Sequence, residues 1–421
     1  MACDANVSND THRTNISLED DKDNARKHYF ETGLNALLAN PNFLLLYVPD
    51  NGTKMRIIRP ASNVYHRNRM IERINEAKYI PSFYYALSHL WGLSENNRYL
   101  WNGISEYVDD EEGIAVKPVS MRPEKRCALL KLLKVHPDSY WWIDVLCART
   151  ETPLDIMGDI YSCCLECVVM IDCEPSLIPK IHAMHHSKME IEELYRTKEY
   201  IAYEQICQTE GLQLTELLYT FFQSRWWKRV WTWQEMALPM GNVRFMAETD
   251  THQLQTNTIT REQLLGFEEM AYIIVFTLNR ALYYNQNELH GARHVDDRML
   301  KLATEVHLDF EDIGCARSSI NYRISGNKRD FAIIIASLMY STRRCYDPAD
   351  YVYGVLGMMR IKIPRMSDPN AVWWHLLSKL DDLVPLGSRR WIDRAHEIDL
   401  RKVQTLGDVF SKVLDVYNGT K

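Results

Sequence analysis

Short apolar runs alternate with stretches of helical periodicity in the first half of the chain. The runs are rich in aromatic and β-branched residues, which is typical of buried strands. We predict four strands in this way, at residues 83–90, 140–147, 168–172 and 243–246. Helical patterns lie between them, at 124–135 and from Thr152 through Cys167, where Thr152 is a suitable N-cap and Pro153 a suitable first helical residue. The alternation predicts an α/β fold with a parallel sheet and crossover helices.

A different pattern precedes these strands. Residues 1–25 are polar, and we expect them to be disordered. Residues 26–80 are predicted to add a helix that begins near Asn24, a β-hairpin and a basic helix or connector at 64–80. The hairpin is indicated by apolar runs on both sides of Pro49-Asp50-Asn51-Gly52, because Asn-Gly is a strong turn signal.

The second half of the chain has mainly helical patterns. We divide the chain after the N-terminal part into a domain at 81–250, with a helical insertion near 175–215, and a mainly helical region at 251–421. A tryptophan-rich helix is predicted at about 213–238, ending before Pro239 and Gly241.

Composition limits the possible classes of function. The 421 residues carry a net charge of -7 and no long basic run, which argues against general nucleic-acid binding. No apolar run reaches the roughly 18 residues that span a bilayer. The N-terminus lacks the apolar core of a secretory signal, so we expect a cytoplasmic protein in which the 10 cysteines are reduced.

The segment 225–235 has the most unusual composition, because it holds four of the 11 tryptophans. If the segment is one helix, Trp227, Trp231 and Glu235 share one side. The simplest interpretation is an amphipathic packing helix in which Glu235 forms a salt bridge with a nearby arginine.

Polar residues follow two of the predicted strands. Ligands of parallel α/β sheets collect beyond the carboxyl ends of the strands, and anions are favoured at helix N-termini there. That rule groups the following residues: Ser88, His89, Trp91, Gly92, Asp144 and Arg149. Local hydrogen bonding of Ser88 and His89 within a loop is an equally good interpretation. Adjacent strand residues point to opposite faces, so these two do not form a nucleophile–base pair by themselves.

Common cofactor motifs are absent from the sequence. It contains neither Gly-x-Gly-x-x-Gly, nor a P-loop motif, nor His-Glu-x-x-His. Cys164-x-x-Cys167 has a spacing suitable for zinc, but it lies in a predicted helix and a second Cys-x-x-Cys is missing. We therefore expect no metal and favour buried cysteines, with a zinc-stabilised scaffold as a weaker hypothesis.

Three segments in order resemble the fungal heterokaryon incompatibility (HET) domain. They are Tyr85-Ala86-Leu87-Ser88-His89-Leu90-Trp91-Gly92, then Trp142-Ile143-Asp144-Val145-Leu146-Cys147 continued by Met157-Gly158-Asp159-Ile160-Tyr161, and finally Trp226 to Glu235. Ala148-Arg149 departs from the Ile-Asn that is common in the family. The stretch from Asp347 to Gly357 also resembles an element found downstream in HET proteins.

The HET domain is in turn similar to Toll/interleukin-receptor (TIR) domains, which implies a TIR-like, flavodoxin-like sheet. Trp231 and Glu235 then correspond to the Trp-x-x-x-Glu of TIR domains that cleave NAD, which implies that Glu235 is a catalytic carboxylate. NAD or a related nucleotide would be the substrate, with no other cofactor.

The implied binding residues combine the two strand-end groups with the tryptophan segment. They are Ser88, His89, Trp91, Gly92, Asp144, Arg149, Trp227, Arg229 and Trp231. Tryptophan faces suit a cationic ring or adenine, and arginine suits pyrophosphate. We expect Trp226 and Trp233 to pack in the core, and Trp231 and Glu235 to face the site.

The resemblance implies a cell-death effector that acts as a homo-oligomer or filament. The alternative is a non-enzymatic TIR-like module that self-associates and recruits partners through exposed aromatic residues.

Overall fold

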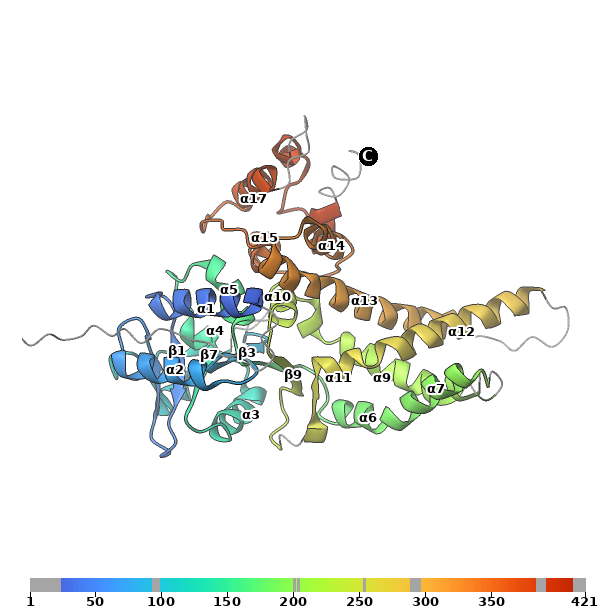
Figure 1. Cartoon of the computed structure of the whole chain (residues 1–421), viewed down its shortest axis with the longest axis horizontal. Coiled ribbons are helices and arrows are strands. Elements are labelled where there is room, and N and C mark those ends of the chain that lie inside the picture. The colour runs from blue at the N-terminus through green and yellow to red at the C-terminus, as the bar shows by residue number, and fades with distance from the viewer. Residues whose placement is uncertain are drawn as a thin grey trace, which may run out of the picture.

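A computed structural model describes residues 24–92, 99–199, 202, 205–252, 255–287, 297–383 and 391–411 (Figure 1). The polar segment expected to be disordered, 1–25, falls almost entirely outside these residues.

One mixed sheet forms the centre of the fold. Its eight strands lie in the order β10-β9-β8-β3-β7-β1-β2-β5. Their bounds are β1 Leu45–Val48, β2 Met55–Ile58, β3 Tyr84–His89, β5 Val108–Asp109, β7 Ser139–Ile143, β8 Glu166–Ile171, β9 Asn242–Ala247 and β10 Thr258–Thr260. A separate two-stranded ribbon pairs β4 (Leu100–Trp101) with β6 (Val119–Ser120). The predicted α/β class, with a parallel sheet and a helical C-terminal region, is confirmed.

Strands β7, β3, β8 and β9 are neighbours and run parallel. In chain order this is the 2-1-3-4 arrangement of flavodoxin-like sheets, whose ligands bind where the order reverses, here between β3 and β8. The connection from β3 to β7 leads away from β8, whereas that from β7 to β8 passes back over β3. Right-handed crossovers therefore place their helices, α3 (Pro123–Lys134) and α5 (Met157–Ser162), on opposite faces, as Figure 1 shows.

The predicted N-terminal elements are present. Helix α1 covers Asn24–Ala39, and α2 covers Val64–Glu76. β1 and β2 form the antiparallel hairpin, with Gly52 at a positive φ of 70° that glycine adopts without strain. The hairpin is continuous with the main sheet, because β1 pairs with β7.

Two predicted boundaries are wrong. The strand predicted at 140–147 ends at Ile143, and Asp144–Cys147 form one helical turn, α4. The helix predicted from Thr152 through Cys167 consists of a short 3₁₀ turn, η2 (Leu154–Ile156), and α5, and it ends at Ser162. The backbone N–H of Leu165 instead donates to Tyr84 O, 2.8 Å away, so pairing with β3 takes over where the local pattern favours a helix.

The tryptophan-rich segment is not one helix. It divides into α9 (Leu212–Phe222), a 3₁₀ turn η4 (Arg225–Lys228) and α10 (Thr232–Ala237). The Asp172 carboxylate accepts the backbone N–H of Trp226 at 3.1 Å, and Arg344 O accepts that of Val230 at 3.1 Å. These contacts with distant segments replace intrahelical bonds, so Trp227, Trp231 and Glu235 do not share one helix face.

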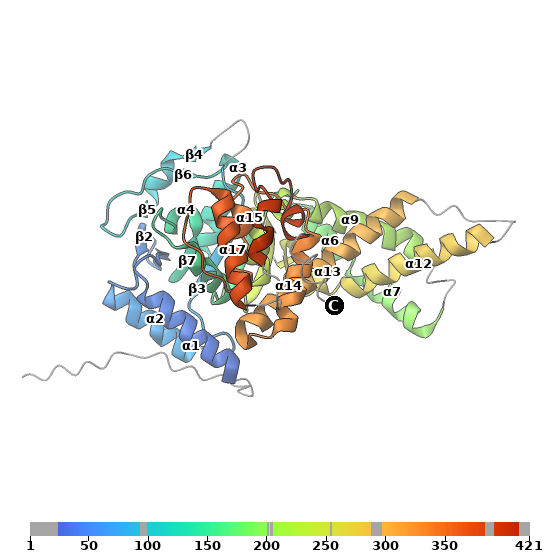
Figure 2. The same ribbon diagram turned by 90° about the horizontal axis from the view of Figure 1, so that it is seen from above.

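Helices dominate the remainder, as predicted. The insertion contains α6 (Leu177–Ala183), α7 (His185–Thr197) and a π-helical turn, η3 (Cys207–Gly211). The C-terminal region contains α11 (Arg261–Leu265), α12 (Glu268–Asn287), α13 (Asp297–Ser325), α14 (Lys328–Met339), α15 (Asp350–Tyr353), α16 (Leu356–Met359), α17 (Pro369–Leu383) and η6 (Trp391–Glu397). Figures 1 and 2 show α7, α12 and α13 extending together from one side of the sheet. Of the helices in the described ranges, none is long and apolar enough to cross a membrane.

Candidate functional site

The carboxyl end of β3 meets the helix that carries Glu235. The Ser88 hydroxyl donates a hydrogen bond to Glu235 Oε2 and accepts one from Trp226 Nε1 at 2.8 Å. All six residues of α10 are buried. The helix contacts β3, so Glu235 lies beside the switch point of the sheet, the place between β3 and β8 where the strand order reverses. Ser88 and Glu235 are predicted from the sequence to share one site, and the structure brings them into contact.

Glu235 is a carboxyl group largely removed from water, with an exposed fraction of 7 %. Burial raises its pKa to about 7, although hydrogen bonds from Ser88 and Tyr161 and the nearby charge of Arg229 act in the opposite direction. The negative charge of Asp144 adds to the effect of burial. Glu235 forms no ion pair within the described residues, so the salt bridge to an arginine in the simplest interpretation is not formed there. A carboxyl with this pKa exchanges a proton near neutral pH.

A second polar cluster lies beside this carboxyl, at the ends of β3 and β7. His89 Nε2 lies 3.0 Å from Asp144 Oδ1, and the indole Nε1 of Trp91 donates to Asp144 Oδ2. On the other side of the ring, Lys125 Nζ lies 2.8 Å from His89 Nδ1 and also donates to Leu90 O. The four side chains thus form a hydrogen-bonded chain from a buried lysine to Trp91, which is 38 % exposed.

The electrostatics of this chain follow from burial and close charges. Burial and the neighbouring Lys125 both lower the pKa of His89, so the ring is neutral at pH 7. Burial disfavours the charged form of Asp144, but His89 and Trp91 outweigh it and keep its pKa below the usual value. Burial lowers the pKa of Lys125 to about 7. Perturbed groups gathered at a sheet edge are typical of a functional site.

The site residues predicted from the sequence do not include Lys125, Tyr161 or the Arg122–Glu248 ion pair. Lys125 has an exposed fraction of 0 % and lies on the apolar stripe of α3 with Ala128 and Leu129. A lysine at an apolar position of a helical pattern was the available signal. The ion pair between Arg122 and Glu248 is also buried, and Glu248 follows directly after β9.

Two of the predicted binding residues at the strand ends have structural contacts. A Cβ at Gly92 would lie 2.6 Å from both Met121 N and Tyr99 O, so glycine permits this close approach of backbones. Arg149 Nη2 lies 3.4 Å from Glu111 Oε2, and the guanidinium contacts carbonyl groups of its own turn. Arg149 is therefore directed toward Glu111 and is not brought to Glu235.

The tryptophans of the segment have different environments. Trp226 and Trp233 are buried in the core, as predicted. Trp227 is also buried, with its ring centroid 5.4 Å from that of Phe245, so it packs in the core and does not face Glu235. Trp231 is half-buried and forms a side-chain hydrogen bond with Asp350 in the C-terminal region.

Arg229 is half-buried, and its charge acts on both Glu235 and Asp350. In the described part of the chain, its guanidinium forms no ion pair. It is therefore a cation that remains available beside the Glu235 carboxyl.

The cysteines near α5 show no metal centre. Cys163, Cys164 and Cys167 are buried, and burial raises the pKa of each thiol. Cys164 Sγ lies 3.1 Å from Tyr161 O. Across the described ranges, no group of three His, Cys, Asp or Glu side chains is placed to hold a metal ion.

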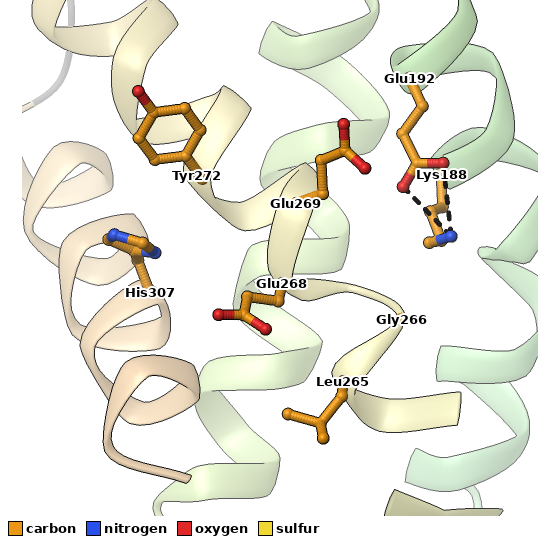
Figure 3. A pocket seen from close by; sticks show the side chains of 8 residues that line it. All are labelled: Lys188, Glu192, Leu265, Gly266, Glu268, Glu269, Tyr272 and His307. Atoms are coloured by element: carbon orange, nitrogen blue, oxygen red, sulfur yellow. Dashed lines mark hydrogen bonds and ion pairs between the residues drawn. The ribbon is translucent and has the colours of Figure 1, made fainter. Parts of the chain in front are cut away.

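A pocket of about 640 Å³ lies elsewhere, between α7, α12 and α13 (Figure 3). Lys188 Nζ is paired there with Glu192 Oε1 at 3.1 Å, while Tyr272 and His307 line the opposite side. None of its lining residues belongs to the carboxyl edge of the sheet, so this pocket is separate from the candidate site.

Comparison with protein families identifies the segment that contains this edge. Residues 84–235 match the family described as heterokaryon incompatibility protein (HET). The match begins with the first residue of β3 and ends at Glu235. Comparisons with curated proteins and with solved structures find no significant match. The predicted HET domain is therefore confirmed for residues 84–235, which make up less than half of the chain.

Proposed function

We propose that the protein acts in heterokaryon incompatibility and the associated cell death, the role that its HET domain indicates. In that role it hydrolyses the N-glycosidic bond between ribose and nicotinamide in NAD, with Glu235 as the catalytic carboxylate. The observation that carries the proposal is the state of Glu235. It is a buried carboxyl whose pKa is raised to about 7, held by Ser88 and Tyr161 beside the switch point of the sheet.

The reaction suits a single carboxylate. Nicotinamide in NAD is cationic and departs as a neutral ring with the electron pair of the glycosidic bond, so it needs no proton from an acid. The ribose carbon becomes oxocarbenium-like, and an ionised Glu235 stabilises that positive charge in a site of low polarity. Water then adds to this carbon and loses a proton, which gives ADP-ribose, nicotinamide and H⁺.

Two neighbouring groups support nucleotide binding. Arg229 supplies a half-buried cation beside Glu235, and arginine is well suited to pyrophosphate oxygens. Trp91 offers an indole ring that is 38 % exposed and fixed through Nε1 by Asp144, and aromatic rings of a nucleotide stack on such a surface.

In this proposal the structure is the resting form of the protein, because Glu235 is only 7 % exposed and substrate cannot reach its carboxyl. The hydroxyl groups of Ser88 and Tyr161 occupy the oxygens that ribose hydroxyls would contact. Substrate entry exchanges these donors for ribose hydroxyls, and we propose that self-assembly of the protein favours this open form.

The experiment measures nicotinamide release from NAD by the 421-residue protein, before and after assembly. Glu235→Gln keeps the size of the side chain and removes its charge, and it is expected to lower release at least a hundredfold. Glu166→Gln is the matched control, since Glu166 is a largely buried glutamate of β8 that pairs with Arg244. Release that is unchanged in Glu235→Gln removes Glu235 from the mechanism.

A second function is favoured by one specific observation. Glu235 is nearly enclosed and hydrogen-bonded, which also fits a purely structural carboxyl in a non-enzymatic module that self-associates. This alternative predicts that the assembled protein neither releases nicotinamide nor binds NAD. It further predicts that Glu235→Gln assembles as the wild type does.

A further inference from the structure

The Lys125 side chain is in an unusual position for a lysine. It is fully buried in the first turn of α3, where the helix dipole disfavours a positive charge. It also occupies the apolar stripe of that helix, together with Leu129 and Leu132. Among the described residues, no carboxylate forms an ion pair with its Nζ. An apolar side chain would stabilise the fold better at this position, so a requirement beyond packing is indicated.

The contacts of Lys125 Nζ indicate what this requirement is. Its two hydrogen-bond partners are His89 Nδ1, at 2.8 Å, and Leu90 O. His89 Nδ1 also lies 2.9 Å from the same Leu90 O. Leu90 O accepts a hydrogen bond and therefore needs a donor. The ring would supply one by carrying a proton on Nδ1, but Lys125 Nζ already donates to this oxygen. If Lys125 donates to both atoms, Nδ1 acts as an acceptor, and a neutral His89 then carries its proton on Nε2.

The proton on Nε2 determines the next contact. Nε2 lies 3.0 Å from Asp144 Oδ1, and only a protonated Nε2 makes this a favourable hydrogen bond. Asp144 in turn accepts the indole Nε1–H of Trp91 with its second oxygen. Three successive hydrogen bonds thus connect a buried lysine to the exposed ring of Trp91.

We propose that Lys125 is a positioning residue of the nucleotide site, which holds His89 in its Nε2–H tautomer and thereby fixes Asp144 and the ring of Trp91 for stacking on a nucleotide base. The inference rests on the proposed function, and it concerns binding of the base and not cleavage of the glycosidic bond. Glu235, which acts on the ribose, has its own partners in Ser88 and Tyr161.

Kinetics with NAD test the separation between binding and cleavage. Lys125→Met is similar in length and removes the donor, so it is expected to raise KM for NAD about tenfold and change kcat less than threefold. Lys125→Arg retains a donor and is expected to restore part of the affinity. Lys131→Met, on the exposed face of the same helix, is the matched control and should behave as the wild type. An unchanged KM in Lys125→Met overturns the inference.

A second measurement does not depend on turnover. Side-chain ¹⁵N shifts report the tautomer of His89, and the resonance is assigned by its loss in His89→Gln. A ¹⁹F label on tryptophan, assigned with Trp91→Phe, reports the environment of Trp91. Both resonances are expected to change in Lys125→Met and not in Lys131→Met; if neither changes, Lys125 does not position these residues.

If Lys125→Met does not fold, a variant of Asp144 tests the same inference. Asp144→Asn retains an acceptor for His89 but no longer accepts the Trp91 indole, so it is expected to raise KM in the same way. An unchanged KM in this variant also overturns the inference. If the wild-type protein releases no nicotinamide, the proposed function fails, while the two resonances still decide the role of Lys125.

Discussion

The guanidinium of Arg343 lies 3.7 Å from the ring centroid of Trp233. Arg343 also donates to Trp227 O, and the exposed fraction of its side chain and backbone together is 8 %. A buried arginine from the C-terminal region therefore packs against α10, the helix that carries Glu235. The charges of Asp309 and Asp312 on α13 act on this guanidinium and support its charged form, although burial lowers the pKa of Arg343 to about 10.

Removal of Arg343 should destabilise the whole protein. Arg343→Ala loses the cation–π contact and leaves Trp227 O without this donor, which together should cost about 3 kcal/mol of unfolding free energy. Urea denaturation measures the loss. Arg344→Ala is a matched control, because the side chain of Arg344 is exposed and its contacts with Lys228 and Val230 use only the backbone. Equal loss in both variants would contradict the importance of the buried guanidinium.

The hydroxyl of Ser88 should control the ionisation of Glu235. Its hydrogen bond lowers the pKa of Glu235, so Ser88→Ala is expected to raise that pKa further. Any activity that needs the ionised carboxyl then rises with pH at a higher midpoint than in the wild type, where the midpoint is near 7. The same variant leaves Trp226 Nε1 unpaired and should cost about 1–2 kcal/mol of stability. A pH–rate profile that does not move would contradict the direct coupling of Ser88 to Glu235.

The buried Glu235 should also make stability depend on pH. Its pKa is about 7 in the folded protein and near 4.5 in the unfolded chain. Between these values the folded state retains a proton that the unfolded state releases, so stability falls as pH rises from about 4.5 to 7. The contribution is on the order of 3 kcal/mol, and it stays lost above pH 7. Unfolding free energies at pH 5 and pH 8 should differ less in Glu235→Gln than in the wild type.

Glycine at position 357 should be required for the contact between α16 and α10, the helix that carries Glu235. A Cβ there would lie 2.8 Å from the Gly158 Cα and would also collide with the buried side chain of Gln234. Gly357→Ala is expected to cost about 2–3 kcal/mol, because backbone must move to admit the methyl group. Gly314→Ala in α13 has no atom within 4 Å of the added methyl and should stabilise the protein by about 0.5–1 kcal/mol. Thermal unfolding of the two variants should thus shift in opposite directions.

Local signals in the sequence determined the elements of the sheet. Apolar runs such as 83–90 and the Asn51-Gly52 turn depend on neighbouring residues only, and burial on both faces leaves such strands few alternatives. The order of the three motifs also indicated that Ser88 and Glu235 lie in one site. This prediction came from the resemblance to a family with a common tertiary structure, because hydrophobic periodicity alone does not show which distant residues meet.

Tertiary structure decided which side chains of those motifs meet. Helical spacing placed Trp227 beside Glu235, but Asp172 and Arg344 take the backbone bonds of that segment and divide the helix, so Trp227 turns into the core. Lys125 follows His89 by 36 residues in the chain, and it reaches that side chain because the crossover after β3 packs α3 against the sheet. Periodicity describes one element at a time, whereas these contacts depend on how distant elements pack and which backbone groups they satisfy.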